Sequence, residues 1–477
     1  MTKSSKNILI SINILVLCIG LGLYILQNKL YSWNILFFTF IALLISCVTL
    51  IFTCFSDPLL KNKVIRPSIL FSLGYLIVFF QFNFDLLIGN TSANNPIFCS
   101  ISVINISALL SLIGFTSFVL GNLFATNKNS YKLSQNNNIQ LYNINSFLRI
   151  QKYLLLLCII VYFYYLGKSI LSGEYIYSQA TMDESAGSVT NYLAVLIYVL
   201  VFTIFTSLIY LYKYNSITLS FGKFIISNGI IFNLSIFLFL MLQFIIGDRG
   251  PIITFILAYL ISYLIISKKN INMLSILLSV LGAAIALTVI GQQRNQPKLS
   301  IKEIVESKTS PEETTISPFT QELASSYKTL TYSMFNIPEK RDFFYGKILI
   351  REGIESFPMM HRLIPIAYSN ISYENNSPSF CTYLIQGGNP NYGNGSSVLA
   401  DIYINFGVIG IVVIMFLWGL IYYKFDLEIY YGNNIYWTLG ALIFFSFALY
   451  ISRATILTPL YYFIPSFLVL KLNKIFK

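Results

Sequence analysis

Three polar side chains lie four residues apart at the start of a long apolar segment late in the chain. Ser397, Asp401 and Asn405 occur within the stretch GSSVLADIYINFG. A spacing of four places side chains on one face of an α-helix, so the pattern predicts a polar stripe entering a membrane-spanning segment. Lipid offers no hydrogen-bond partners, so the stripe must face protein groups or a water-filled cavity. It either lines a functional site or forms polar contacts between helices.

Two very short turns between apolar segments each carry an arginine. One reads GDRGP over residues 247–251 and contains Arg249, and the other reads SRAT over residues 452–455 and contains Arg453. The proline suits the first turn of a helix, so Arg249 would lie beside a helix N-terminus, where backbone N–H groups and a guanidinium together bind phosphate. A third arginine, Arg294, follows an apolar segment on the same side. The alternatives are an Asp–Arg pair that closes the first turn and an arginine that only anchors helix ends.

The single histidine, His361, lies in an apolar segment that reads FPMMHRLIP. An imidazole can take a proton from a sugar hydroxyl near neutral pH, although a lone histidine is more often structural. The sequence contains no P-loop, no D-x-D motif and no group of Cys, His and carboxylates at metal-ligand spacing. We therefore expect no ATP hydrolysis, no metal site and no cofactor.

These residues are embedded in a chain that lipid must solvate. Of its 477 residues 56% are hydrophobic and 10% are charged, whereas a soluble protein carries about 25% charged residues. We predict an all-α, polytopic membrane protein with about twelve transmembrane helices, each of roughly 20 residues. Gly407, Gly410 and Gly419 in the tenth span would let a neighbouring helix approach closely. The predicted spans are residues 8–26, 34–55, 68–89, 99–121, 153–171, 190–212, 222–246, 250–267, 272–291, 403–423, 433–451 and 455–470.

The loops between these spans fall into two sets with different charge. One set, which includes both chain ends, contains 17 lysines and arginines, and the short loops of the other set contain four. Cytoplasmic loops collect positive charge, so we expect both termini inside the cell. The 17 are Lys3, Lys6, Lys61, Lys63, Arg66, Lys128, Lys132, Arg149, Lys152, Lys213, Lys223, Lys268, Lys269, Lys424, Lys471, Lys474 and Lys477. The four are Lys29, Lys168, Arg249 and Arg453.

The long segment 292–402 is then one large extracytoplasmic loop. It separates the first nine spans, within residues 1–291, from the last three, within residues 403–477. Residues 318–334 are expected to form a helix within this loop, with Ser317 as its N-cap and a proline at its first position. This is more ordered sequence than a connector requires.

The segment around the polar stripe resembles bacterial O-antigen polymerases of the Wzy type. Residues 394–397 (NGSS) and 401–410 (DIYINFGVIG) are similar to the segment before a late transmembrane helix in that family. Members of the family often have a small residue followed by a serine there, and then an acidic residue, an aromatic residue and Asn-Phe-Gly. The DRG turn at 248–250 and the PEKRD stretch at 338–342 also resemble it. The layout of many spans with one large late outer loop extends the resemblance over the whole chain.

The resemblance implies a polymerase on the outer face of the bacterial inner membrane. Its donor would be a glycan chain on undecaprenyl pyrophosphate, its acceptor a single lipid-linked repeat unit, and its leaving group the lipid diphosphate. Cations at the outer surface would stabilise that leaving group, and a carboxylate or an imidazole could take the proton of the acceptor hydroxyl. The bilayer is the surrounding medium, a chain-length regulator is a candidate partner, and nucleic acid is not expected.

These roles assign candidate residues in this sequence. The candidate catalytic residues are Arg249, Arg294, Arg453, Asp401 and His361. The candidate substrate-binding residues are Asp248, Ser397, Asn405 and Arg341, and no residue is assigned to a metal. The related O-antigen ligases use a histidine in a loop, and His361 matches it by location only.

Two other functions share part of this pattern. An O-antigen ligase would have the same topology and chemistry but would transfer glycan to a lipid A core, and the Asn-Phe-Gly segment favours the polymerase. A lipid-linked oligosaccharide flippase, which is not an enzyme, would line a central cavity with charges, whereas the spans here are nearly free of charge. A solute transporter is disfavoured because no inverted repeat and no broken helix pair is evident.

Overall fold

The fold is described from a computed structural model of the chain. It describes residues 3–473 apart from 28–29, 58, 62, 64, 127–142, 172–183, 215–216, 247, 268–319, 358–359, 361–371, 391 and 433. All regular structure within these residues is helical. The prediction of an all-α protein is confirmed.

Eight of the described helices are long and apolar enough to cross a membrane. They are α1 (Lys3–Leu26), α2 (Trp33–Ser56), α3 (Pro67–Leu87), α4 (Ile104–Ala125), α5 (Ile144–Leu171), α6 (Glu184–Tyr214), α9 (Arg249–Ser267) and α17 (Val398–Tyr431). Two shorter apolar helices near the end of the chain are α18 (Ile435–Phe447) and α19 (Thr458–Leu472). The polytopic character is confirmed, and the total of twelve spans stays a prediction because residues 272–291 lie outside the described part of the chain.

The predicted span over residues 222–246 is wrong as one straight helix. It consists of a short helix α7 (Phe221–Asn228) and a longer helix α8 (Ile230–Ile246), and the two are bent by 93°. The bend falls at Gly229, which has a φ of +83°. Glycine adopts this left-handed conformation without a steric penalty, so apolar composition alone did not reveal the bend.

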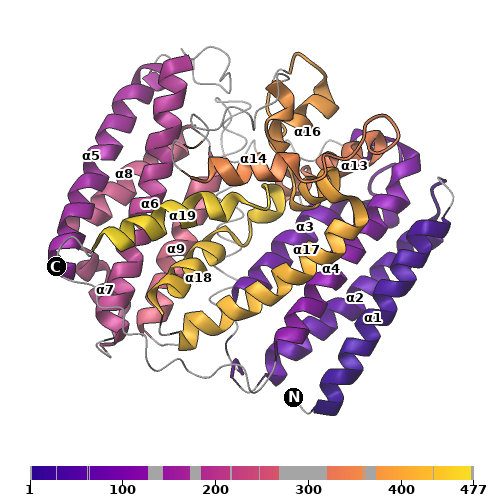
Figure 1. The fold of residues 1–477 in the computed structure, drawn as a ribbon, viewed down its shortest axis with the longest axis horizontal. Helices are drawn as coiled ribbons and strands as arrows, with labels where there is room; N and C mark the ends of the chain where they lie inside the picture. Colours follow the sequence, from indigo (N-terminus) through magenta and orange to yellow (C-terminus); the bar gives the residue numbers. More distant parts are fainter. Residues whose placement is uncertain are drawn as a thin grey trace.

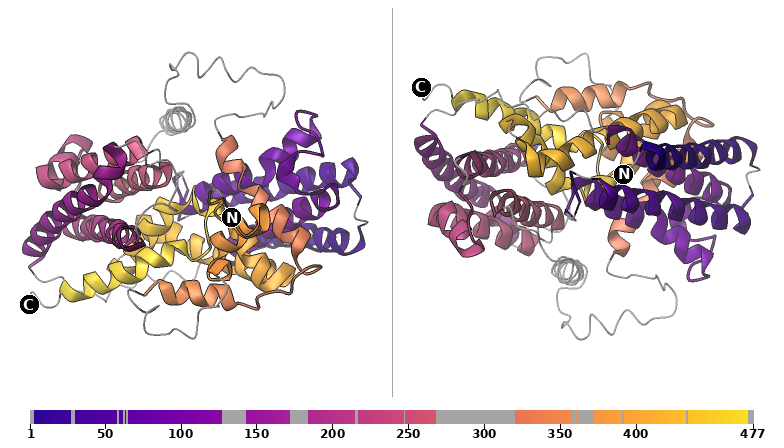
Figure 2. Two further views of the ribbon diagram at one scale, coloured as in Figure 1. Left: turned by 90° about the horizontal axis from the view of Figure 1, so that it is seen from above. Right: turned by 90° about the horizontal axis from the view of Figure 1, so that it is seen from below.

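The long helices form two groups that meet at the C-terminal helices. Helices α1 to α4 and α17 form one group, and α5, α6, α8 and α9 form the other, with α18 and α19 packed between them (Figures 1 and 2). Helix α4 is central to its group, since 94% of the residues in its most apolar stretch are buried, compared with 17% of those in α1. Large apolar side chains such as Leu15 and Leu44 stay exposed on α1 and α2, which suits a lipid-facing surface.

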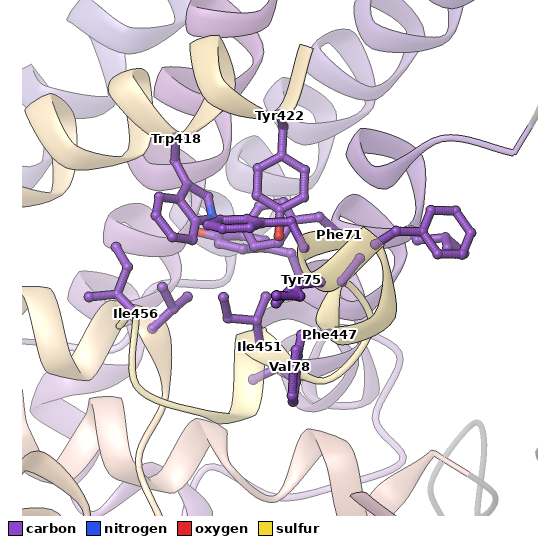
Figure 3. Packing of buried hydrophobic residues seen from close by; sticks show 14 of the residues in the cluster. Phe71, Tyr75, Val78, Trp418, Tyr422, Phe447, Ile451 and Ile456 are labelled. Carbon is purple, nitrogen blue, oxygen red and sulfur yellow. The ribbon is translucent and has the colours of Figure 1, made fainter. Parts of the chain in front are cut away.

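Small residues bring α4 and α17 into close contact. A Cβ atom on Gly121 would collide with the backbone oxygen of Phe416, and one on Gly419 would collide with that of Phe118. The prediction that Gly419 permits close approach is confirmed. An aromatic core lies beside this contact (Figure 3). It contains Phe71 and Tyr75 of α3 together with Tyr422 and Trp418 of α17, and Phe71 packs against Tyr422. The Tyr75 hydroxyl donates to the Ser111 carbonyl at 2.8 Å, which satisfies its buried polar atom.

Helix α17 is interrupted at Gly407, and this is a different role from the close packing that the sequence predicted for that glycine. Gly407 has a φ of +61° and a ψ of −152°. Beside the break, the carbonyl of Ile404 accepts a hydrogen bond from the Phe344 N–H at 3.0 Å, and Phe343 packs against Gly407. The break therefore holds the segment that leads into α14 (Lys347–Glu355) against α17.

Four short helices cover the end of the bundle that lies opposite the N-terminus (Figure 1). They are α12 (Gln321–Ala324), α13 (Tyr327–Asn336), α14 and α16 (Ser377–Gln386), with a 3₁₀ turn η5 at Ser372–Glu374. The predicted helix over residues 318–334 is wrong as a single unit, because α12 ends before Ser325 and α13 begins at Tyr327. Its expected cap, Ser317, lies outside the described residues. We call this region the α14 end of the bundle.

Candidate active site

The predicted polar stripe forms the start of α17. Ser397 is the N-cap, and its Oγ accepts hydrogen bonds from the Ala400 N–H at 3.4 Å and from Thr329 Oγ1 at 2.8 Å. Asn405 donates from Nδ2 to the Asp401 carbonyl at 2.9 Å. Ser397, Asp401 and Asn405 are all buried, so of the two expected environments, protein groups or a water-filled cavity, these side chains lie among protein groups.

The Asp401 carboxylate joins three separate segments of the chain. Its Oδ1 accepts a hydrogen bond from Ser377 Oγ at 2.5 Å, and its Oδ2 accepts one from the Ile456 N–H at 2.9 Å. Ser377 is the first residue of α16, and Ile456 follows the turn that carries Arg453. One carboxylate thus ties α17 to α16 and to the Arg453 turn.

A second buried carboxylate, Glu352 of α14, shares the same serine. Its Oε1 accepts a hydrogen bond from the Ser377 N–H at 2.8 Å, and the residue is 1% exposed. Burial, followed by the nearby Asp401 carboxylate, raises the pKa of Glu352 well above its usual range. Glu352 could not be predicted from the sequence, because a glutamate in an amphipathic helix is typical of a solvated surface and nothing in its spacing points to Asp401.

Arg453 ends a 3₁₀ turn, η6 (Ile451–Arg453), that is anchored by its apolar neighbours. Ile451 and Ile456 are buried on either side of the arginine, and Ile451 lies beside Val78 of α3 (Figure 3). The Arg453 Nη1 atom donates to Glu322 of α12, at 3.1 Å to Oε1 and 3.2 Å to the carbonyl. The Arg453 side chain is 25% exposed, so the guanidinium lies at the edge of the packed region.

The turn around Arg249 lies close to the Arg453 turn. The Asp248 Oδ1 atom accepts a hydrogen bond from the Gly250 N–H at 3.1 Å, which closes the turn at the start of α9. A Cβ atom on Gly250 would lie 3.5 Å from the ring of Tyr450, three residues before Arg453. Arg249 is the first residue of α9, as predicted, and its side chain lies outside the described part. The two predicted arginine turns are therefore neighbours in space.

Arg341 belongs to a separate aromatic cluster. Its guanidinium pairs with Glu374 at 3.1 Å and donates to the hydroxyls of Tyr373 and Tyr383 at 3.2 and 3.3 Å. The two tyrosine rings are parallel, with centroids 3.8 Å apart. The hydrogen bond from Arg341 lowers the pKa of Tyr373. These contacts hold η5 against α16, whose first residue is Ser377.

Two predicted site residues, Arg294 and His361, lie outside the described residues. Their roles stay predictions. The remaining predicted residues, with the exception of Arg341, gather at or beside the first turns of α17 and α9 and the η6 turn.

The chain matches a known protein family over almost its entire length. The family model of the O-antigen polysaccharide polymerase Wzy matches residues 8–476. The chain belongs to this family. No curated protein and no solved structure matches it.

Membership of the Wzy family makes this protein a multi-pass membrane polymerase of O-antigen synthesis, with a lipid-linked oligosaccharide as substrate. Such a polymerase must join saccharide units. The α14 end of this Wzy protein offers the group types that such a reaction requires. They are arginines in turns beside helix starts, and hydroxyl and amide side chains along the first turns of α17.

Proposed function

We propose that this protein joins undecaprenyl-pyrophosphate-linked oligosaccharide repeat units on the outer face of the bacterial inner membrane. The acceptor is a hydroxyl oxygen of a single lipid-linked repeat unit. It forms a new bond to the anomeric carbon of the growing chain while the bond from that carbon to the diphosphate breaks. The hydroxyl proton leaves to a base or to the departing diphosphate, and lipid diphosphate is the second product.

The observation that carries the proposal is the convergence of the Arg249 and Arg453 turns near the N-terminus of α17. Gly250 packs beside Tyr450, and the Asp401 carboxylate binds the backbone three residues after Arg453. Negative charge that develops on a leaving diphosphate is stabilised by fixed guanidinium groups and by the N–H groups of helix starts. We assign diphosphate binding to Arg249 and Arg453, and this assignment requires no metal ion.

The proposed function also implies which end of the helix bundle faces the outside of the cell. The α14 end lies opposite the N-terminus (Figure 1), and the charge bias of the loops favours a cytoplasmic N-terminus. The α14 end would then face the outside, where lipid-linked repeat units are polymerised. Both termini would be cytoplasmic.

A deletion strain and a reconstituted reaction test the proposal together. Loss of the gene should leave single repeat units on the surface glycan, and purified protein in vesicles should lengthen lipid-linked repeat units in the presence of EDTA. A strain whose surface lacks every repeat unit while lipid-linked units stay unattached would identify a ligase. Lipid-linked units trapped on the inner leaflet would identify a flippase.

A further inference from the structure

Two carboxylates are buried at the α14 end with a single serine between them. The Ser377 N–H donates to Glu352 Oε1 at 2.8 Å, while the Ser377 hydroxyl donates to Asp401 Oδ1 at 2.5 Å. Glu352 is 1% exposed and Asp401 is fully buried. Two buried like charges this close to a common partner are costly, because neither water nor distance screens their repulsion.

The titratable groups that act on the pair are acidic or neutral, so they do not compensate its negative charge. The charged groups that act most strongly on Glu352 are Asp401 and Glu355, and both are acidic. On α16 the neighbouring titratable group is the Cys381 thiol, whose pKa burial raises to about 12, so it stays neutral. Two arginines of neighbouring segments donate to other acceptors: Arg351 to the Glu374 carbonyl and Arg453 to Glu322.

The hydrogen bonds distinguish the two carboxylates. Both oxygens of Asp401 accept a hydrogen bond, one from Ser377 and one from the Ile456 N–H. Glu352 Oε2 is buried and has no hydrogen-bond partner among the described residues. An ionised carboxylate needs hydrogen-bond donors at both oxygens, so the pattern suits a charged Asp401 and a neutral Glu352.

We propose that Glu352 and Asp401 share one proton, which resides on Glu352, and that this pair positions the turn that carries Arg453. Asp401 reaches the turn directly through the Ile456 N–H, and Glu352 and Ser377 hold the Asp401 carboxylate in place. Neither carboxylate needs to touch substrate in this role. The inference rests on the proposed function, in which Arg453 binds the diphosphate.

The pair makes the protein sensitive to rising pH. The folded-state pKa of Glu352 is raised above that of the unfolded chain. Its contribution to stability is therefore fully present below the usual glutamate pKa and is lost as the pH rises towards the raised value. Above that value two anions would compete for Ser377, and the bond from Asp401 to the Arg453 turn would weaken.

Three single variants in vesicles and in detergent test the proposal. Glu352→Gln reproduces a protonated glutamate in shape and charge, so it should keep polymerase activity at neutral pH. Asp401→Asn offers one acceptor oxygen where the carboxylate offers two, so it should lose about tenfold or more at every pH. Glu355→Gln, on the same helix, is the matched control. It should keep activity at neutral pH and a pH profile that still falls, moved slightly to lower pH because Glu355 helps to raise the pKa of Glu352.

The pH profiles decide between a shared proton and a merely structural contact. As the pH rises above the usual glutamate pKa towards the raised pKa of Glu352, the wild type and Glu355→Gln should lose both rate and unfolding temperature. The rate should fall by up to about tenfold per pH unit above the pKa of Glu352. Glu352→Gln should be flat in both measurements, because its amide cannot ionise.

Three outcomes would overturn the proposal. They are parallel pH profiles for wild type and Glu352→Gln, a loss of activity in Glu352→Gln as large as in Asp401→Asn, and a Glu352→Gln protein that cannot be recovered folded at neutral pH. The unfolding temperature does not depend on catalysis. A wild type with no polymerase activity would therefore refute the proposed function while the unfolding profiles still test the proton pair.

Discussion

Replacing Arg453 with lysine keeps the positive charge of the turn and removes its planar fork, and we expect most of the polymerase activity to be lost. A guanidinium has five N–H donors in one plane, whereas an ammonium is a point charge with three. In this structure the Nη1 donors are directed to the Glu322 carboxylate and carbonyl. A lysine could keep that pair or approach a diphosphate, but it could not hold both in the geometry that the arginine provides.

The expected magnitudes separate catalysis from stability. A charge-assisted contact to a developing oxyanion contributes about 2.7–4 kcal/mol to the transition state, which corresponds to a loss of about a hundredfold to a thousandfold in rate. The ion pair with Glu322 is only partly buried, with side-chain exposures of 25% and 36%. A pair of this kind contributes about 0.2–1 kcal/mol to folding, so the unfolding temperature of Arg453→Lys should change little.

The assay is polymer length and initial rate at matched membrane expression, with Glu322→Gln as the control. If Arg453 serves only to hold α12, then Glu322→Gln should cost as much activity as Arg453→Lys. We expect Glu322→Gln to lose far less, because the guanidinium is kept. Full-length polymer from Arg453→Lys would refute the assignment of Arg453 to the diphosphate, and the same test applies to Arg249→Lys.

Two further predictions concern orientation and packing. Reporter fusions at Lys269 and Ser310 should give opposite signals, because the charge bias places them on different sides of the membrane; equal signals would refute the topology. Gly419→Leu should sharply reduce the yield of folded protein, because its side chain would meet the backbone of α4 at Phe118. Gly222→Leu is the matched control, since a Cβ atom there meets nothing within 4 Å, and equal yields would contradict the packing argument.

Much of the candidate site could be predicted from local patterns. The stripe at Ser397, Asp401 and Asn405 follows helical periodicity, and its burial follows from the absence of hydrogen-bond partners in lipid. The start of α9 at Arg249 follows from a proline that suits the first turn of a helix. These features depend on residues within a few positions of one another, so the sequence contains all the information they require.

The parts that could not be predicted depend on contacts between distant segments. Glu352 and Asp401 both bind Ser377, and beside the break at Gly407 the Ile404 carbonyl accepts from the Phe344 N–H in the segment that leads into α14. The break itself has no local signal, because a glycine in an apolar helix is common in membrane proteins. The bend at Gly229 was missed for the same reason.

Each end of α17 contains a buried carboxylate, and the groups that surround its charge differ between the two ends. At the end away from α14, Asp426 accepts from the Ser68 N–H and hydroxyl at 3.1 and 2.5 Å, and the buried Arg66 lies close enough to attract it. At the α14 end, Asp401 has a second carboxylate, Glu352, as its neighbour. A buried acid with a cation suits a fixed structural contact, whereas two acids that share a serine suit a proton that can leave.

Asp426→Asn should therefore affect folding and leave catalysis intact. The substitution removes the charge that attracts the buried Arg66 and changes an acceptor of the two Ser68 hydrogen bonds, so buried polar groups at this end of α17 lose part of their compensation. We expect a lower unfolding temperature and a lower folded yield, while the rate per folded molecule and its pH profile match the wild type. The measurement is initial rate normalised to folded protein from size-exclusion chromatography. A changed pH profile in Asp426→Asn would show that the protein senses pH through α17 as a whole, and it would remove the distinction between its two ends.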